Sequence, residues 1–281
     1  MQTYGQSISR RHFVASTMAA MATFARPGAA AKGSIPVALQ LYSIREDCAR
    51  DLAGSLAAVA KMGYDGVEFA GYYGHAATEV RAMLDGVHLK AFSSHNNIKL
   101  LLGDELEKTV EFNRILGNSR VMVASLPAST TIQKWVDYAK EFNEIAEKLK
   151  PHQMRVGFHN HARELEPLEG KLPYDVFLDN TSKEVIMQMD LAHYPEHNLN
   201  PVDYMKRYPG RARTIHVKDF APEGRKVLLG DGVMDWKSVF QAAESVGGIE
   251  VYIIEQEKYP EPLTPLQCAA RCFENFCRLH G

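Results

Sequence analysis

Residues 155–161 read Arg-Val-Gly-Phe-His-Asn-His, a short apolar run that is rich in β-forming residues and ends abruptly in ionisable side chains. Similar runs recur along the chain from residue 35 onward, separated by stretches with helical periodicity. Continuous apolar character, rather than strict alternation, is typical of strands that are covered on both faces. We therefore expect eight strands, at residues 37–41, 66–70, 90–94, 120–124, 155–159, 185–189, 214–217 and 251–255.

Amphipathic stretches separate these runs. Between residues 132 and 149 apolar side chains recur at intervals of three and four, as a helix with one buried face requires: Trp135, Tyr138, Phe142, Ile145 and Leu149. Further helices are expected at residues 50–62, 106–116, 236–245 and 266–279, and shorter ones at 174–178 and 202–208.

This alternation is the signature of consecutive βα units, and it predicts the α/β class with a single (β/α)8 TIM barrel. Such barrels typically need about 250 residues, and the chain has 281. A doubly wound open sheet is the structural alternative. The two differ in where polar residues gather, because a barrel collects its chemistry at the C-terminal ends of many strands, whereas an open sheet uses one switch point.

The N-terminus has a different character. Arg10 and Arg11 precede an apolar run at residues 13–24, and Ala29-Ala30-Ala31 offers a small-residue cleavage site. The run is shorter than the roughly 18 residues that a membrane span needs. This order resembles a bacterial twin-arginine signal, which hands a folded protein to the export machinery and predicts a periplasmic or extracytoplasmic location. A disordered N-terminal arm is the alternative.

We expect the export signal to occupy residues 1–31 and the barrel residues 32–281. Without the signal, 29 basic residues stand against 34 acidic ones, so the formal net charge changes from −2 to −5. An acidic chain disfavours a nucleic-acid partner, and the lack of a long apolar run argues against a stable membrane anchor. The four cysteines include no CxxC motif, and the chain is too long for a small disulfide scaffold.

Ionisable and amide side chains gather at the ends of the predicted strands. In a closed barrel these ends meet at one mouth, where carboxylates and imidazoles can hold a divalent ion. His216 is the clearest case, because a histidine within an apolar strand is too polar for a barrel core unless it faces a site. The strand-end residues are Gln40, Glu68, His95, His159, Asn160, His161, Asp190, His193, His216, Lys218, Asp219, Glu255, Gln256 and Glu257.

Several motifs together resemble the xylose-isomerase-like barrel superfamily (AP endonuclease 2-like), in the sugar phosphate isomerase/epimerase branch related to D-tagatose 3-epimerase and inosose dehydratase. The resemblance covers essentially everything after the signal. It rests on Gln40-Leu41-Tyr42-Ser43, Gly66-Val67-Glu68, Gly157-Phe158-His159-Asn160-His161 with Glu164, Asp190, His216-Val217-Lys218-Asp219, Gly230-Asp231-Gly232 with Asp235-Trp236, and Ile254-Glu255-Gln256.

This resemblance implies one divalent metal, held by a glutamate on strand five, an aspartate on six, a histidine on seven and a glutamate on eight. Asp190, His216 and Glu255 match the last three positions. On the fifth strand His159 stands where the family has glutamate, and Glu164 is the nearest carboxylate that could replace it. A mixed imidazole and carboxylate set favours Mn, Zn, Co or Fe over Mg, which prefers oxygen ligands and water.

A divalent ion that ligates a carbonyl oxygen and the neighbouring hydroxyl lowers the pKa of the C–H bond between them, so that a carboxylate can remove the proton. The candidate bases are Glu255 and Glu164. Candidates for protonating the substrate or holding its hydroxyls are His161, His193 and Lys218. Gln40, Glu68 and His95 are candidate substrate contacts. Glu68 and His95 could equally be solvated loop residues, and His193 could be a surface histidine.

The expected activity is that of a metal-dependent sugar isomerase or epimerase, acting on a small carbohydrate or keto-sugar by proton abstraction next to its carbonyl. Loss of a β-substituent would instead make the enzyme a lyase or dehydratase on 3-keto-glycosides or keto-polyols. Export in the folded state favours unphosphorylated sugars. Two other classes share such a barrel: a non-catalytic sugar-binding module and an endonuclease IV-like phosphodiesterase, which the acidic chain disfavours.

Overall fold

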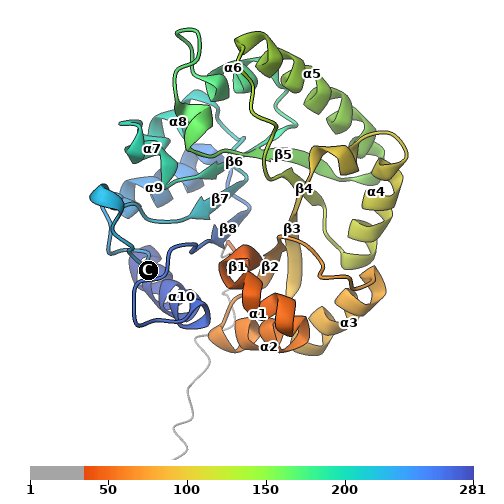
Figure 1. The fold of residues 1–281 in the computed structure, drawn as a ribbon, viewed down its shortest axis with the longest axis vertical. Coiled ribbons are helices and arrows are strands. Elements are labelled where there is room, and N and C mark those ends of the chain that lie inside the picture. The colour runs from red at the N-terminus through yellow and green to blue at the C-terminus, as the bar shows by residue number, and fades with distance from the viewer. Residues whose placement is uncertain (1–34) are drawn as a thin grey trace, which may run out of the picture.

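The computed structural model describes residues 35–281, and eight parallel strands within this range close into a barrel (Figure 1). The first strand pairs with the last, with Val37 opposite Tyr252. The prediction of a single barrel is therefore confirmed, and the open sheet is wrong. The strands are β1 (Val37–Gln40), β2 (Gly66–Phe69), β3 (Lys90–Asn96), β4 (Arg120–Val123), β5 (Arg155–His159), β6 (Ile186–Asp190), β7 (Thr214–Val217) and β8 (Val251–Ile254).

The predicted export signal, residues 1–31, lies outside the described residues. Within residues 35–281, no helix combines the length and the apolar character that crossing a bilayer requires.

The helices form a ring around the barrel (Figure 1). They are α1 (Arg45–Arg50), α2 (Leu52–Met62), α3 (Ala77–Val87), α4 (Glu105–Leu116), α5 (Ile132–Leu149), α6 (Pro173–Asn180), α7 (His193–Glu196), α8 (Pro201–Arg207), α9 (Trp236–Ala242) and α10 (Pro265–His280). The stretch predicted as one helix at 50–62 begins instead at Leu52, because the backbone of Asp51 is extended and its side chain caps α2 at the N–H of Gly54. Helix α3 was not predicted.

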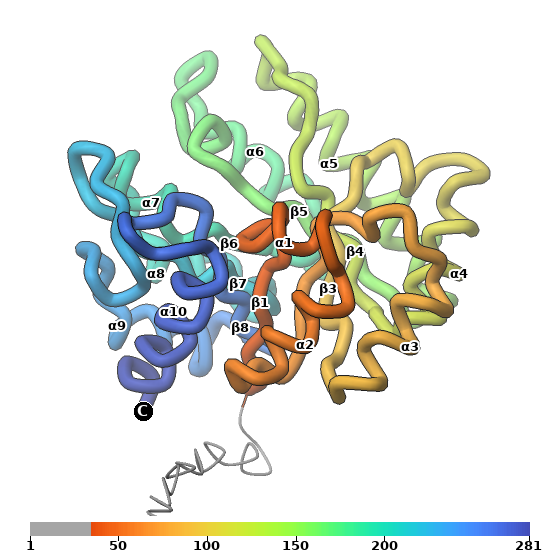
Figure 2. Tube along the Cα trace, turned by 60° about the horizontal axis from the view of Figure 1, so that its bottom comes forward, coloured from red at the N-terminus to blue at the C-terminus, as the bar shows by residue number. Residues whose placement is uncertain are grey.

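The main apolar core lies between the strands and the helix ring. The predicted stripe on α5 is buried, and its Phe142 contacts Phe158 on β5 and Phe177 on α6, with ring centroids 6.0 and 4.9 Å apart. The last helix completes the ring beside α2 (Figure 2), where the Tyr64 hydroxyl donates a hydrogen bond of 2.9 Å to the carbonyl of Ala269. The ring thus closes at the same seam as the barrel.

Two strand glycines mark places where neighbouring strands approach closely. A β-carbon on Gly157 would lie 2.3 Å from Sδ of Met122, and one on Gly66 would lie 2.2 Å from the carbonyl oxygen of Lys90. Real β-carbons essentially never come so close to other atoms. A side chain at either position would force its neighbours to shift: the Met122 side chain at Gly157, and the backbone of Lys90 at Gly66.

At the N-terminal ends of the strands, one carboxylate holds three arginines. Glu250, just before β8, accepts hydrogen bonds from Arg155 at 3.1 Å and from Arg213 at 2.6 Å. Nε of Arg120 donates to the same carboxylate at 3.1 Å. These four residues, the basal cluster, connect the starts of β4, β5, β7 and β8, and polar contacts at this end of a barrel serve stability.

Candidate metal centre and active site

A cavity of about 430 Å³ opens at the C-terminal ends of the strands. Its lining includes His95 from β3, His159 from β5, Asp190 from β6 and Glu255 after β8. The segments that follow β4 and β5 extend beyond the strand ends (Figure 2) and contribute Ser125 and other residues to the wall. The position and the polar lining match the mouth where barrel enzymes place their chemistry.

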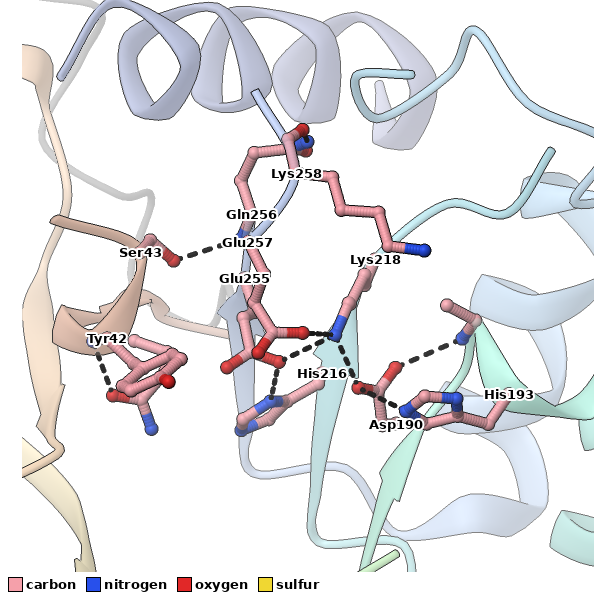
Figure 3. Close-up of polar contacts among 12 residues, drawn as sticks. Tyr42, Ser43, Asp190, His193, His216, Lys218, Glu255, Gln256, Glu257 and Lys258 are labelled. Atoms are coloured by element: carbon pink, nitrogen blue, oxygen red, sulfur yellow. Dashed lines mark hydrogen bonds and ion pairs between the residues drawn. The ribbon is translucent and has the colours of Figure 1, made fainter. Parts of the chain in front are cut away.

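Four residues of this mouth bring their ligand atoms within 4.8 Å of one another: His159, Asp190, His216 and Glu255. We call them the donor group. Strand register explains the convergence, because Asp190 lies directly opposite His216 in the β6–β7 pair. All four side chains are buried. Figure 3 shows Asp190, His216 and Glu255 pointing toward one region from neighbouring strands.

The donor group fits a divalent metal ion. Within residues 35–281, Nδ1 of His159 is buried without a hydrogen-bond partner, so this nitrogen is available to coordinate an ion. Buried carboxylates need a cation beside them, and here Nζ of Lys218 lies 2.9 Å from Oδ2 of Asp190 and 3.3 Å from Oε2 of Glu255 (Figure 3). The ammonium group shows that this position attracts positive charge, and two imidazoles with two carboxylates suit a transition metal or zinc.

The protonation states of the donor group follow from its burial and charges. Burial, together with His216 and His95, lowers the pKa of His159 well below its usual value, so its ring is neutral. Burial would raise the pKa of Glu255, but Lys218 and His216 outweigh it and lower the pKa to about 2. Burial would also lower the pKa of His216, which Glu255 and Glu68 instead raise to about 10. Ion binding at His216 therefore displaces a proton.

Lys218 and His193 flank the donor group. Besides Asp190 and Glu255, the Lys218 ammonium contacts the Glu257 carboxylate, which also lines the cavity. Nε2 of His193 lies 3.4 Å from Oδ2 of Asp190. Both side chains line an adjoining cavity, which shares Glu257 with the first one, so they lie beside the donor group rather than on the wall of the first cavity.

Three predicted substrate contacts lie at different depths. His95 lines the cavity, whereas Gln40 and Glu68 are fully buried beneath it. Glu68 accepts hydrogen bonds from Nε2 of Gln40 (2.7 Å), Nε2 of Gln188 (2.7 Å) and Nε2 of His216 (2.6 Å). Nε2 of His95 lies 3.1 Å from the same carboxylate. We call Glu68 and these four residues the interior cluster.

The structure does not bring Glu164 into the donor group. Its carboxylate is fully buried and accepts hydrogen bonds from the backbone N–H of His161 at 2.8 Å and from Nε of Arg163 at 2.6 Å. It thereby caps the short 3-10 turn Ala162–Leu165. His161 itself lines the cavity, with its ring centroid 4.8 Å from that of His159. Of the two fifth-strand candidates, the donor group thus contains His159.

Two residues of the site had no role predicted from the sequence. Gln188 joins Glu68 to His95, since its Oε1 lies 2.8 Å from Nε2 of His95. It lies two positions before Asp190 on β6, and residues two apart on a strand share a face, so this signal was present in the sequence. Glu257 was noted only as a strand-end residue. Its contact with Lys218 joins residues 39 positions apart, which no local pattern reveals.

Matches among protein families, characterised proteins and solved structures point to the same family. Residues 56–276 match the family described as "Xylose isomerase-like TIM barrel". The chain is 22% identical to an inosose dehydratase of Histophilus somni, over 65% of this chain and 68% of that protein. It is 22% identical to the rhizopine catabolism protein MocC of Rhizobium meliloti, over 88% of this chain and 89% of that protein.

Solved structures share the fold. A sugar phosphate isomerase/epimerase from Parabacteroides distasonis is 24% identical, with a TM-score of 0.76 over 87% of this chain and 98% of that one. The IOLI protein with a bound zinc atom is 15% identical, with a TM-score of 0.68 over 87% of this chain and 98% of that one.

Proposed function

The chain belongs to the xylose isomerase-like TIM barrel family, and from this premise we propose that it is a metal-dependent enzyme that removes the proton next to a carbonyl of a carbohydrate or keto-sugar. The observation that carries the proposal is the donor group: four buried ligand residues, with ligand atoms within 4.8 Å of one another, three of which line a polar cavity. Sugar isomerase/epimerase and dehydratase names among the similar proteins support the substrate class.

A divalent ion held by the donor group would act as a Lewis acid on the substrate carbonyl and lower the pKa of the adjacent C–H bond. Glu255 is our candidate base, because its carboxylate is ionised and belongs to the cavity wall. Lys218, 3.3 Å from Glu255, is the candidate acid. Return of the proton to the opposite face of the same carbon gives an epimer, and return to the neighbouring carbon gives an isomer.

The donor set also favours certain ions. Two imidazoles beside two carboxylates match the preferences of Zn, Mn, Co or Fe better than those of Mg. The zinc atom in the IOLI structure supports this choice, since that protein shares the fold. We therefore expect one Zn, Mn, Co or Fe ion per chain.

Dehydration is the second candidate reaction, favoured by the inosose dehydratases among the similar proteins. In a keto-polyol, the same base would take the proton next to the carbonyl, and the hydroxyl on the following carbon would leave as water after accepting a proton from Lys218 or His193. A C=C bond conjugated to the carbonyl would form. A 3-keto-glycoside would lose its glycosidic substituent in the same way.

The decisive experiment combines metal analysis with a panel of unphosphorylated keto-sugars and keto-polyols in heavy water. We expect about one ion per chain, and loss of the NMR signal of the proton next to the carbonyl. A chelator should stop the exchange, and added Mn or Co should restore it. Formation of an enone would identify the dehydratase. Sugar binding without exchange or metal would identify a non-catalytic barrel, and cleavage of abasic DNA a phosphodiesterase.

We also propose that residues 1–31 direct export, on the basis of Arg10 and Arg11 ahead of the apolar run. Export of the folded protein would let the donor group take up its ion in the cytoplasm. Changing both arginines to lysine should retain the protein in the cytoplasm, as fractionation would show. Continued export of that variant would contradict the proposal.

A further inference from the structure

The interior cluster contains a carboxylate that neither the donor group nor the cavity uses. Glu68 is completely buried, and its four neighbours come from β1, β3, β6 and β7. A buried carboxylate with this many contacts either stabilises the fold or orients the groups that touch it. The identity of those groups distinguishes the two roles.

The two glutamine amides are oriented as donors toward Glu68. Oε1 of Gln40 accepts the backbone N–H of Tyr42 at 3.0 Å, so its NH₂ group faces the carboxylate. The NH₂ group of Gln188 also reaches Oγ1 of Thr214, at 3.2 Å. Both oxygens of Glu68 therefore act as acceptors, and the imidazoles that touch it must donate.

The imidazoles of His95 and His216 both approach Glu68 through Nε2. Their rings lie nearly parallel, with centroids 5.4 Å apart. A neutral imidazole carries its proton on one nitrogen and a lone pair on the other. With Nε2 directed at Glu68, the Nδ1 atoms remain for other partners. Nδ1 of His216 lies 3.1 Å from the Glu255 carboxylate oxygen Oε2, so without an ion this nitrogen carries a proton, and an ion bound there would displace it.

We propose that Glu68 is a positioning residue, which fixes the ring orientation and tautomer of His216 and His95 from inside the barrel so that each directs Nδ1 to the ion and the substrate. This inference rests on the proposed metal-dependent function. His95 extends the effect to the substrate side, because its ligand atom lies within 4.8 Å of those of His159 and His216 and its ring lines the cavity. Glu68 itself touches neither substrate nor ion.

Glu68→Gln is the sharpest test, because the two side chains have nearly the same shape. An amide accepts at one atom only, so its NH₂ group must face either Gln188 or the other three donors. We expect zinc affinity, measured by competition with a chromophoric chelator, to fall about 10- to 100-fold, as when a ligand loses its supporting hydrogen bond. Glu250→Gln is the matched control: it alters the carboxylate of the basal cluster and should leave zinc affinity unchanged.

A second readout is independent of metal. In the metal-free protein, ¹⁵N NMR should find the proton of His95 on Nε2, and Glu68→Gln should remove this fixed assignment. His216, whose two ring nitrogens face Glu68 and Glu255, should carry a proton on each. Unchanged zinc affinity and unchanged histidine spectra would overturn the inference. If Glu68→Gln does not fold, Glu68→Asp, which keeps the charge but shortens its reach, must still lower zinc affinity. A wild-type protein that binds no metal would refute the proposed function, whereas the NMR result would still decide the role of Glu68.

Discussion

Two carboxylates organise opposite ends of this barrel, and they do so with different partners. Glu250 in the basal cluster is 27% exposed and binds three guanidinium groups. Glu68 in the interior cluster is fully buried and binds two amides and two imidazoles. Both connect strands that are distant in sequence.

The partners explain the difference in role. A guanidinium group keeps its charge at every physiological pH and has no second face for chemistry, so the basal cluster only holds strands together. An imidazole that donates through one nitrogen still has the other nitrogen for a ligand or a proton. The same device, a carboxylate shared between strands, thus stabilises one end of the barrel and orients the reactive groups at the other.

The largest effect should come from removing Asp190, His216 or Glu255 from the donor group. Asp190→Ala, His216→Ala and Glu255→Ala should each lower metal affinity by more than about 100-fold, since even loss of a ligand's supporting contacts costs ~10- to 100-fold. Catalysed exchange should disappear with the ion. Elemental analysis of the purified variants measures the first effect, with Glu250→Gln as the control from the other end. Full metal occupancy in all three variants would show that the site is wrongly assigned.

Lys218→Met separates catalysis from metal binding. Loss of a proton donor typically lowers turnover by about 10²- to 10⁴-fold. Metal affinity should rise, because Asp190 and Glu255 lose the ammonium group that now lies between them. Exchange rates and chelator competition report the two effects, and the exposed Lys226→Met is the control. Normal exchange in Lys218→Met would remove this residue from the mechanism.

The two candidate ligands at the fifth strand, His159 and Glu164, should differ in their effect on metal binding. His159→Ala should weaken metal binding about 100-fold. The wild-type affinity should fall as the pH falls, because protons compete with the ion for His216, whose pKa is raised to about 10. Glu164→Gln should keep its ion, because the Glu164 carboxylate binds Arg163 and the His161 backbone instead. If the His159→Ala variant kept its metal and the Glu164→Gln variant lost it, Glu164 rather than His159 would be the fifth-strand ligand.

The basal cluster should affect stability alone. Burial would raise the pKa of Glu250, but its hydrogen bonds with Arg120 and Arg213 lower it below the usual value. The stabilisation is therefore present above the unfolded-state pKa of about 4.3 and is lost as the pH falls through the lower folded-state value. Glu250→Gln should lower the free energy of unfolding by about 1–3 kcal/mol at pH 7. The difference in unfolding free energy between wild type and variant should narrow as the pH falls below about 4.3.

Urea unfolding at several pH values measures this difference, with the exposed Glu107→Gln as the control. A difference that stays constant down to pH 3 would mean that the charge of Glu250 does not stabilise the fold. Unchanged metal affinity in Glu250→Gln is equally part of the prediction, since it keeps the two ends of the barrel distinct.

The barrel could be predicted because each strand has a local sequence signal, an apolar run that ends in polar residues. Boundaries moved by one or two residues: β6 ends at Asp190 rather than before it, and β3 extends to Asn96. Helix α3 was missed because its N-cap position is Ala76, which lacks a capping side chain, and Gly86 interrupts its last turn.

The site was predicted less completely, for a physical reason. Strand-end position and family resemblance named Asp190, His216 and Glu255, and the structure brings their ligand atoms together. The hydrogen-bond partners of the site residues could not be predicted, because they are distant in sequence. Glu68, for example, accepts a hydrogen bond from Gln188, 120 positions later. Glu164 was considered a base, and this role stays a prediction; its buried carboxylate also caps a turn that no periodicity indicated.

Because the donors of the site lie on β5 to β7 and directly after β8, the site can form only late in the synthesis of the chain. Chains emerge N-terminus first, so Glu68 is made long before His216, its partner 148 positions later, and Glu255 follows the last strand. The four-donor group cannot exist until β8, which Glu255 follows directly, has joined β7. A nascent or truncated chain that lacks β8 therefore has no complete donor group, and an ion bound by all four donors would report that the last strand is in place.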